Sequence, residues 1–362
     1  MVRMVILGAR AGGRKRATAA RAFSLIELLT VIFIISLLIA ILIPSLTSAR
    51  NAAKKTTTHA ALNAIRVALE SFKNDNERDF KGTNGYPPSF AHPPVGTYFT
   101  AMDGIEGKFP FLEQKPVVYG AHWLPAMLIG VDAQGYVKRS TAATLPPAKQ
   151  PPWEWYKPFD NGKLVDRTPL YLDPAGLRLV ATKDLPGFRN PQVITDTNWG
   201  DENNENDRKM ARLPVITDAF GQAILYYAAN AYGKPTNLVE PKRDINNDYG
   251  EGQDPPYYFH QDNEGFTGND AYPNGWSYGG SNFHWIAKSG NDATAMDVES
   301  FEDGKTFARF ILDRNAYRAL INRVERSPMK SINADSYLLV SASVDGLYGS
   351  ADDVTNFPSP AE

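Results

Sequence analysis

Residues 22–43 read Ala22-Phe-Ser-Leu-Ile-Glu-Leu-Leu-Thr-Val-Ile-Phe-Ile-Ile-Ser-Leu-Leu-Ile-Ala-Ile-Leu-Ile43. From Phe23 onward nearly every side chain is apolar, and a helix of this length can cross a bilayer core of about 30 Å. The preceding residues 1–22 carry six basic side chains and no acid. Because basic flanks stay on the cytoplasmic side, we predict a single span in the inner (cytoplasmic) membrane. Its N-terminus would be cytoplasmic, and the remaining chain would be exported to the periplasmic side.

Glu27 is the one ionisable side chain within this apolar run. An unpaired acid inside a membrane costs about 2.5 kcal/mol or more, so such a residue is a functional candidate that needs a partner. A cut between Ala22 and Phe23 would free an α-amino group four residues before Glu27. We predict that Glu27 of a neighbouring subunit neutralises this ammonium inside a filament.

Two simpler membrane signals compete with this interpretation. An ordinary secretory signal peptide has a shorter apolar core followed by a small-residue cleavage site. No such site lies between residue 23 and Pro44, so the sequence does not favour it. A signal anchor that holds the chain in the membrane without processing is the stronger alternative.

The motif Ala22-Phe-Ser-Leu-Ile-Glu-Leu-Leu29 resembles the signal of type IV pilins and of type II secretion pseudopilins. The resemblance implies that a prepilin peptidase cuts between Ala22 and Phe23 and methylates the new amine of Phe23. It also implies partners, namely other pilin or pseudopilin subunits and an inner-membrane assembly platform. The family usually has Gly before the cut, where this chain has Ala22. Pro44 falls where the family often has a helix-kinking proline.

Helical spacing of apolar residues resumes after Pro44, so we expect this proline to kink the helix rather than end it. The domains predicted are a cleaved leader (1–22), a transmembrane half-helix (23–43), an extracytoplasmic half-helix (44–78) and a globular head (79–362). The spacing predicts a stripe that packs on the head; its members are Leu62, Ile65, Leu69 and Phe72. The polar residues Lys54, Lys55 and His59 are interpreted as solvated or packing side chains.

The head contains no cysteine, which excludes disulfides and thiolate metal sites. Residues 217–228 read as a turn followed by a strand, and residues 282–287 and 336–341 are further predicted strands. Residues 301–326 have helical spacing. The turn at Asp218–Gly221 resembles the start of the first sheet strand in pseudopilin heads. The predicted fold class is α+β: one long helix packed on a small antiparallel sheet with large loop insertions.

Residues 341–357 read Ser341-Ala-Ser-Val-Asp-Gly-Leu-Tyr-Gly-Ser-Ala-Asp-Asp-Val-Thr-Asn-Phe357 and combine carboxylates with glycines. Ca²⁺ prefers six to eight oxygen ligands of this kind. The segment resembles the C-terminal calcium loop of the major pseudopilin of type II secretion. That resemblance implies side-chain ligands from Asp345 and Asp352, carbonyl ligands from Ala342 and Ser350, and Asp353 as a supplement. The alternative is a solvated acidic turn.

Two other acidic runs are better interpreted as polar loops than as metal sites. Residues 244–254 begin like an EF-hand, but Tyr249 stands where the turn needs Gly and Pro255 where the bidentate Glu should be. Residues 201–207 are assigned in the same way.

The sequence predicts a structural protein rather than an enzyme, because it contains no catalytic or nucleotide-binding motif. The net charge of −2 gives no reason to expect nucleic acid as a partner. The predicted function is a pseudopilin subunit of a type II secretion-like filament. Two alternatives remain: a type IV pilus subunit for adhesion, uptake or motility, and a membrane-anchored hydrolase or binding domain.

Overall fold

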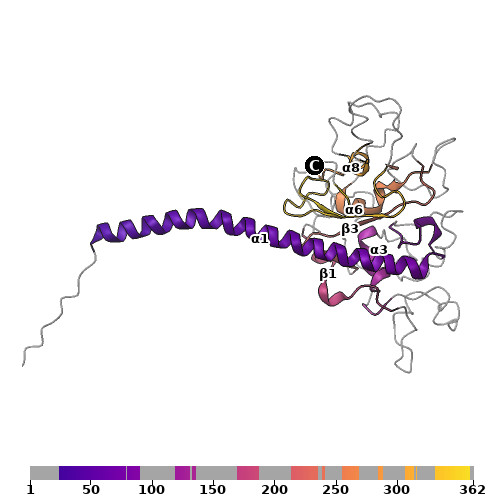
Figure 1. Cartoon of the computed structure of the whole chain (residues 1–362), viewed down its shortest axis with the longest axis horizontal. Helices are drawn as coiled ribbons and strands as arrows, with labels where there is room; N and C mark the ends of the chain where they lie inside the picture. Colours follow the sequence, from indigo (N-terminus) through magenta and orange to yellow (C-terminus); the bar gives the residue numbers. More distant parts are fainter. Residues whose placement is uncertain are drawn as a thin grey trace, which may run out of the picture. The chain divides into compact units, whose positions relative to one another are not determined.

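The computed structural model (Figure 1) describes residues 24–78, 80–89, 119–130, 133–135, 169–186, 213–234, 239–240, 255–268, 284–287, 306–313, 315 and 331–358. The Ala22–Phe23 junction and the acidic runs 201–207 and 244–254 lie outside these residues. The chain divides into two compact units, Met1–Asn51 and Ala52–Glu362. Helix α1 (Leu25–Asn76) contributes to both.

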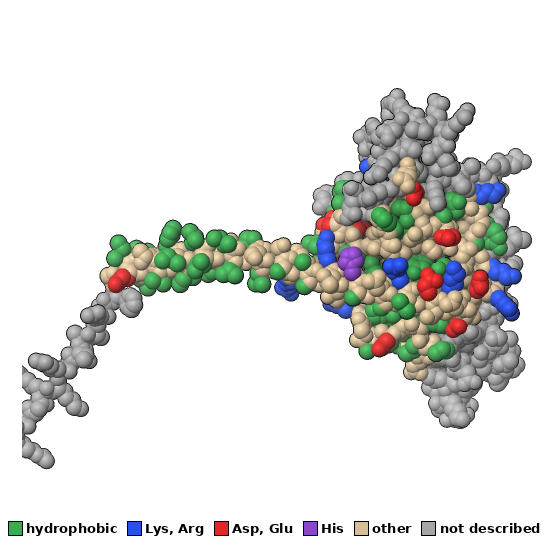
Figure 2. Space-filling model, viewed as in Figure 1, with side chains coloured by type: hydrophobic (Ala, Val, Ile, Leu, Met, Phe, Trp, Pro, Cys, Tyr) green, Lys and Arg blue, Asp and Glu red, His purple; other side chains and the backbone are tan. Residues whose placement is uncertain are grey.

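The first half of α1 exposes its apolar side chains on every face. Hydrophobic side chains, green in Figure 2, cover its visible surface. Within the described chain, α1 is the one helix that is long and apolar enough to cross a membrane. Pro44 lies inside α1, and the helix continues beyond it. The prediction that Pro44 does not end the helix is therefore confirmed.

The second half of α1 buries one face in the head, as its spacing predicts. The stripe Leu62, Ile65, Leu69 and Phe72 is at most 2% exposed. The Phe72 ring lies 5.3 Å from the ring of Phe80 and 5.3 Å from that of Tyr171. This stripe belongs to one hydrophobic cluster with the sheet strands of the head. Burial of this face fixes the second half of α1 as part of the core.

The largest sheet among the described residues has three antiparallel strands in the order β3–β6–β7. Its strands are β3 (Leu225–Ala228), β6 (Tyr337–Ser341) and β7 (Val354–Thr355). Leu225 lies opposite Val340, and both side chains are buried. The strands predicted near residues 225–228 and 336–341 are confirmed.

Two smaller strand pairs complete the sheets of the described chain. The first, β1 (Arg178–Ala181) with β2 (Pro214–Thr217), is antiparallel. The second, β4 (Val239–Glu240) with β5 (Tyr258–Phe259), is parallel. The α+β description therefore holds, with several short sheets where a single small sheet was predicted.

The described chain also has three short α-helices and four 3₁₀ turns, some before β1 and some between strands. The helices are α3 (Gly120–Leu128), α6 (Glu264–Thr267) and α8 (Phe307–Ile311). The turns are η1 (Lys81–Thr83), η4 (Pro174–Gly176), η5 (Thr182–Asp184) and η7 (His260–Asn263). All nine residues of α3 are buried, so this helix is a core element.

The helix predicted over residues 301–326 is much shorter where the structure describes it. Helix α8 ends at Ile311 because Leu312 adopts an extended conformation and forms a bridge with Ser331. Residues 314 and 316–330 lie outside the described chain.

The strand predicted over residues 282–287 is wrong at 284–287, which form a turn. The N–H groups of Trp285 and Ile286 both donate to the Tyr348 carbonyl, at 2.9 and 3.3 Å. Because these donors converge on one acceptor, they cannot pair with successive residues of a strand. Residues 282–283 lie outside the described chain.

Helix α3 and strand β3 approach so closely that only glycine fits at residue 120. A Cβ atom there would lie 1.9 Å from the Tyr226 carbonyl oxygen. The Asn263 side chain joins the same two elements: it donates to Tyr226 O at 2.7 Å and accepts from Ala121 N–H at 3.0 Å. This contact holds α3 against the sheet.

His122 is a fully buried residue of α3 with a defined neutral state. Its Nδ1 accepts from the Tyr119 N–H at 3.1 Å. Its Nε2 lies 3.0 Å from the Thr182 hydroxyl, which itself donates to Leu213 O. Nε2 therefore carries the proton and donates to Thr182. Burial lowers the pKa of His122 from 6.5 to about 3.

We predict that this histidine destabilises the head in acid. Its folded-state pKa lies below its unfolded value, so the stability it contributes is complete above pH 6.5 and is lost as pH falls toward 3. Between pH 6 and 4, the unfolding free energy of the full chain in detergent should fall about 1.4 kcal/mol per pH unit faster than that of His122→Gln. Denaturant titrations followed by tryptophan fluorescence measure this difference, and parallel pH curves would contradict it.

Candidate functional site

Helix α1 begins with a reciprocal pair of hydrogen bonds between Ser24 and Glu27. The Ser24 N–H donates to Glu27 Oε2 at 2.9 Å, and the Glu27 N–H donates to Ser24 Oγ at 3.2 Å. This is a capping box, in which two otherwise unpaired backbone donors are satisfied. Glu27 thus has a partner in its own chain, which the sequence analysis missed although the Ser-x-x-Glu pattern predicts it. The neighbour's Phe23 ammonium stays a prediction as its partner.

The second candidate is the loop of residues 342–353, which joins β6 to β7 and is called here the acidic loop. The structure brings Asp345, Asp352 and Asp353 together, with one oxygen from each within 4.8 Å of the others. Gly349 has a φ of +92°, and a Cβ atom there would lie 2.5 Å from Ile286 Cγ2. The loop can therefore turn tightly against residues 284–287.

Hydrogen bonds within the acidic loop hold each carboxylate in place. Asp345 Oδ1 accepts from Leu347 N–H at 2.8 Å, Asp352 Oδ2 from Val344 N–H at 3.0 Å, and Asp353 Oδ2 from Gly349 N–H at 2.6 Å. The loop backbone thus orients all three predicted side-chain ligands.

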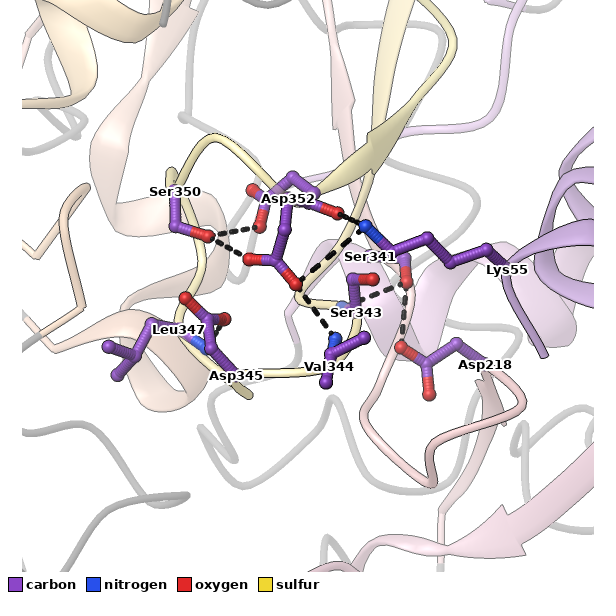
Figure 3. A network of polar contacts seen from close by, with 10 residues as sticks. Lys55, Asp218, Ser341, Ser343, Val344, Asp345, Leu347, Ser350 and Asp352 are labelled. Atoms are coloured by element: carbon purple, nitrogen blue, oxygen red, sulfur yellow. Dashed lines mark hydrogen bonds and ion pairs between the residues drawn. The ribbon is translucent and has the colours of Figure 1, made fainter. Parts of the chain in front are cut away.

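Ala342 and Ser350 are the two residues predicted to bind a metal through their carbonyls. In the structure, the Ser350 side chain forms hydrogen bonds with the acids of the loop. Its hydroxyl bridges two acids, lying 2.6 Å from Asp352 Oδ1 and 3.3 Å from Asp353 Oδ1. Figure 3 shows Ser350 beside Asp352. Ala342 is fully buried directly after β6. Carbonyl ligation by Ala342 and Ser350 stays a prediction.

The crowded carboxylates shift one another's pKa. Burial raises the pKa of Asp345, and the charge of Asp352 raises it further. Burial also raises the pKa of Asp353 well above its usual value, and the charges of Asp345 and Asp352 add to this. For Asp352, burial alone would raise the pKa, but hydrogen bonds from the Ser350 hydroxyl and the Val344 N–H lower it. The cluster therefore favours a bound cation or proton.

The donor set of the acidic loop fits a hard cation such as Ca²⁺, which binds oxygen ligands, including carboxylates. Three carboxylates converge here. The Ser343 hydroxyl of the same loop is buried and has no hydrogen-bond partner among the residues the structure describes. Asp345, Asp352 and Asp353 are thus the residues that could hold such an ion.

The turn at residues 218–221 supports the acidic loop from one side. Asp218 Oδ2 accepts from the Ser341 hydroxyl at 2.7 Å, while its Oδ1 accepts from the N–H groups of Phe220 and Gln222. The turn also contacts α1, because Ala219 N–H donates to the Thr58 hydroxyl at 3.2 Å. Asp218 therefore connects the turn to the start of the loop.

Residues 284–287 support the loop through Tyr348. The Tyr348 N–H donates to His284 Nδ1 at 3.2 Å, and the Tyr348 hydroxyl donates to Ala223 O at 2.7 Å. Burial lowers the pKa of His284 to about 4, which keeps Nδ1 unprotonated, so that it can accept this hydrogen bond. The sequence carries no spacing signal that pairs His284 with residue 348.

Lys55 of α1 contacts the acidic loop. The sequence interpretation of Lys55 as a solvated or packing residue did not predict this contact. The Lys55 Nζ donates to the Asp352 carbonyl at 3.1 Å and lies 4.0 Å from Asp352 Oδ2. Figure 3 shows the side chain reaching the loop from the helix. By contrast, Lys54 lies over the Phe220 ring at 4.9 Å, and His59 is exposed, as interpreted.

Searches of protein-family models, of curated proteins and of solved structures found no match to this chain.

Replacing Asp218 should destabilise the head. In Asp218→Ala the Phe220 and Gln222 N–H groups and the Ser341 hydroxyl lose their acceptor, so we expect a loss of about 2–4 kcal/mol in unfolding free energy. Asp218→Asn keeps one carbonyl acceptor and should lose less. The exposed Asp184→Ala is the control and should change stability by no more than about 0.5 kcal/mol. Equal stability of Asp218→Ala and Asp184→Ala in denaturant titrations would contradict this role.

Proposed function

We propose that this chain is a structural filament subunit, a pseudopilin of a type II secretion-like apparatus. The observation that carries the proposal is the division of α1 into two surfaces. Its first half exposes apolar side chains all round, while its second half buries one stripe in the head. The motif at residues 22–29 resembles a prepilin signal and supports the same proposal.

The exposed half of α1 requires a cover, because apolar surface of this extent is unfavourable in water. A bilayer supplies it while the chain is a single-pass membrane protein. In a filament, the same surface would pack against α1 of other copies. Helix packing would then replace lipid as the subunit leaves the membrane.

Glu27 would keep its carboxylate paired both in the membrane-inserted subunit and in the filament. In the single chain its carboxylate caps α1 through Ser24. Ser24 directly follows Phe23, so the Phe23 ammonium of a processed chain would lie beside this capping box in the sequence. We propose that a neighbour's ammonium replaces the Ser24 N–H as the partner of Glu27 during assembly. The exchange leaves the carboxylate paired throughout.

The acidic loop would bind Ca²⁺ and stabilise the head. The chain has no cysteine, so no disulfide can tie the short strand β7 to the rest of the sheet. A metal held by Asp345, Asp352 and Asp353 would close the connection from β6 to β7, because binding energy at a folded site adds to folding energy.

Mass spectrometry of the mature N-terminus tests the proposed processing. In cells with a prepilin peptidase, the purified chain should begin at an N-methylated Phe23; in cells without it, the chain should begin at Met1. A chain that keeps Met1 in both strains would contradict the proposed function. Electron microscopy of the same preparations should show filaments only where Phe23 is methylated.

Calcium removal tests the acidic loop. At Ca²⁺ concentrations about 100-fold above the dissociation constant, binding adds about 2.7 kcal/mol. For a chain of 362 residues, that corresponds to a melting temperature about 4 °C higher than in EDTA. Asp345→Asn should lose most of this difference, whereas the exposed Asp335→Asn should keep it. An unchanged melting temperature of the wild-type chain on chelation would show that the loop is no calcium site.

A further inference from the structure

Lys55 connects two parts of the chain that are 297 residues apart. Its ammonium donates to the backbone carbonyl of Asp352 at 3.1 Å and lies 4.0 Å from the Asp352 carboxylate. Asp352 is also one of the three converging carboxylates of the acidic loop. The ammonium therefore reaches both the backbone and the side chain of a proposed metal ligand.

Negative charge exceeds positive charge in the acidic loop. Three carboxylates meet in the acidic loop, and Lys55–Asp352 is the one ion pair found among the residues that the structure describes. The Lys55 and Asp352 side chains are 36% and 30% exposed. Because both side chains are partly shielded, their interaction is screened less than that of a fully exposed pair. The Lys55 ammonium thus offsets part of the negative charge of the three carboxylates in the acidic loop.

We infer that Lys55 is a built-in cation that competes with Ca²⁺ for the acidic loop and couples metal binding to α1. This inference rests on the proposed calcium site. Without metal, the ammonium offsets part of the carboxylate charge. When a divalent ion binds the same carboxylates, the ammonium is repelled, so the Lys55 contact opposes the binding of the metal.

The size of this competition follows from Coulomb's law. A divalent ion and an ammonium about 6 Å apart in water-like surroundings repel each other enough to change affinity about tenfold. Coupling is reciprocal by thermodynamic linkage, so bound Ca²⁺ weakens the Lys55 contact by the same factor. The acidic loop would therefore hold α1 through Lys55 most firmly when it carries no metal.

Charge-neutral and charge-retaining variants separate this role from simple packing. Lys55→Gln removes the charge, and Lys55→Arg keeps it. Lys54→Gln is the matched control, because it removes the same charge one residue earlier, from a side chain that lies over the Phe220 ring. Ca²⁺ is titrated into each full chain in detergent by isothermal titration calorimetry, at low salt and at about 1 M salt, where charges are screened beyond about 3 Å.

The expected result is a Ca²⁺ dissociation constant about tenfold lower for Lys55→Gln than for wild type. Lys55→Arg should bind like wild type, Lys54→Gln should change much less, and the gain should shrink in high salt. In EDTA, Lys55→Gln should melt at a lower temperature than wild type, because the carboxylates then lack their cation. Ca²⁺ should therefore raise the melting temperature of Lys55→Gln by more than it raises that of wild type.

The outcomes distinguish this inference from the calcium site itself. If wild type binds Ca²⁺ but Lys55→Gln binds it equally or more weakly, the role of Lys55 is wrong and the site stands. If neither chain binds Ca²⁺, both proposals are overturned. Binding by Lys55→Gln alone would support the competition and overturn Ca²⁺ as a ligand of the native chain.

Discussion

The burial of one stripe of α1 is the interaction on which the head depends. The strands of the described chain are two to five residues long, and short strand pairs of this kind are marginal in water without a further hydrophobic surface. Leu62, Ile65, Leu69 and Phe72 supply that surface and join the strands and α3 in one cluster. The same helix continues into an exposed apolar half that is long and apolar enough to cross a membrane, so one element combines a buried and an exposed apolar surface.

Polar contacts then place the acidic loop on this core. Asp218 connects it to the turn before β3, Tyr348 to residues 284–287, and Lys55 to α1. These three supports come from separate parts of the sequence, so the position of the acidic loop depends on residues outside it, while hydrogen bonds within the loop orient its carboxylates. An acidic turn formed by neighbouring residues alone would not require the contacts of Asp218, Tyr348 and Lys55.

The sequence predicts features that depend on near neighbours in the chain. The period of α1, the turn at Asp218 and strand β6 all follow from local spacing, and the structure has them. The Ser24–Glu27 capping box is equally local, because the Ser-x-x-Glu pattern places both residues at the start of α1. The aromatic and apolar composition of residues 284–287 is typical of strands, but they form a turn in which the N–H groups of Trp285 and Ile286 both donate to the Tyr348 carbonyl. The partner of Lys55 could not be predicted, since no local pattern relates residues 297 apart.

The separation between Lys55 and Asp352 also orders events in time. During synthesis, α1 is complete long before residue 352 exists, while folding is slowed by contacts between distant residues. Helix α1 would be available before most of the head, and β7 and the acidic loop would join the sheet last. Until β7 has been added, β6 would lack this strand partner, and an unpaired strand edge of this kind makes a growing chain prone to aggregation.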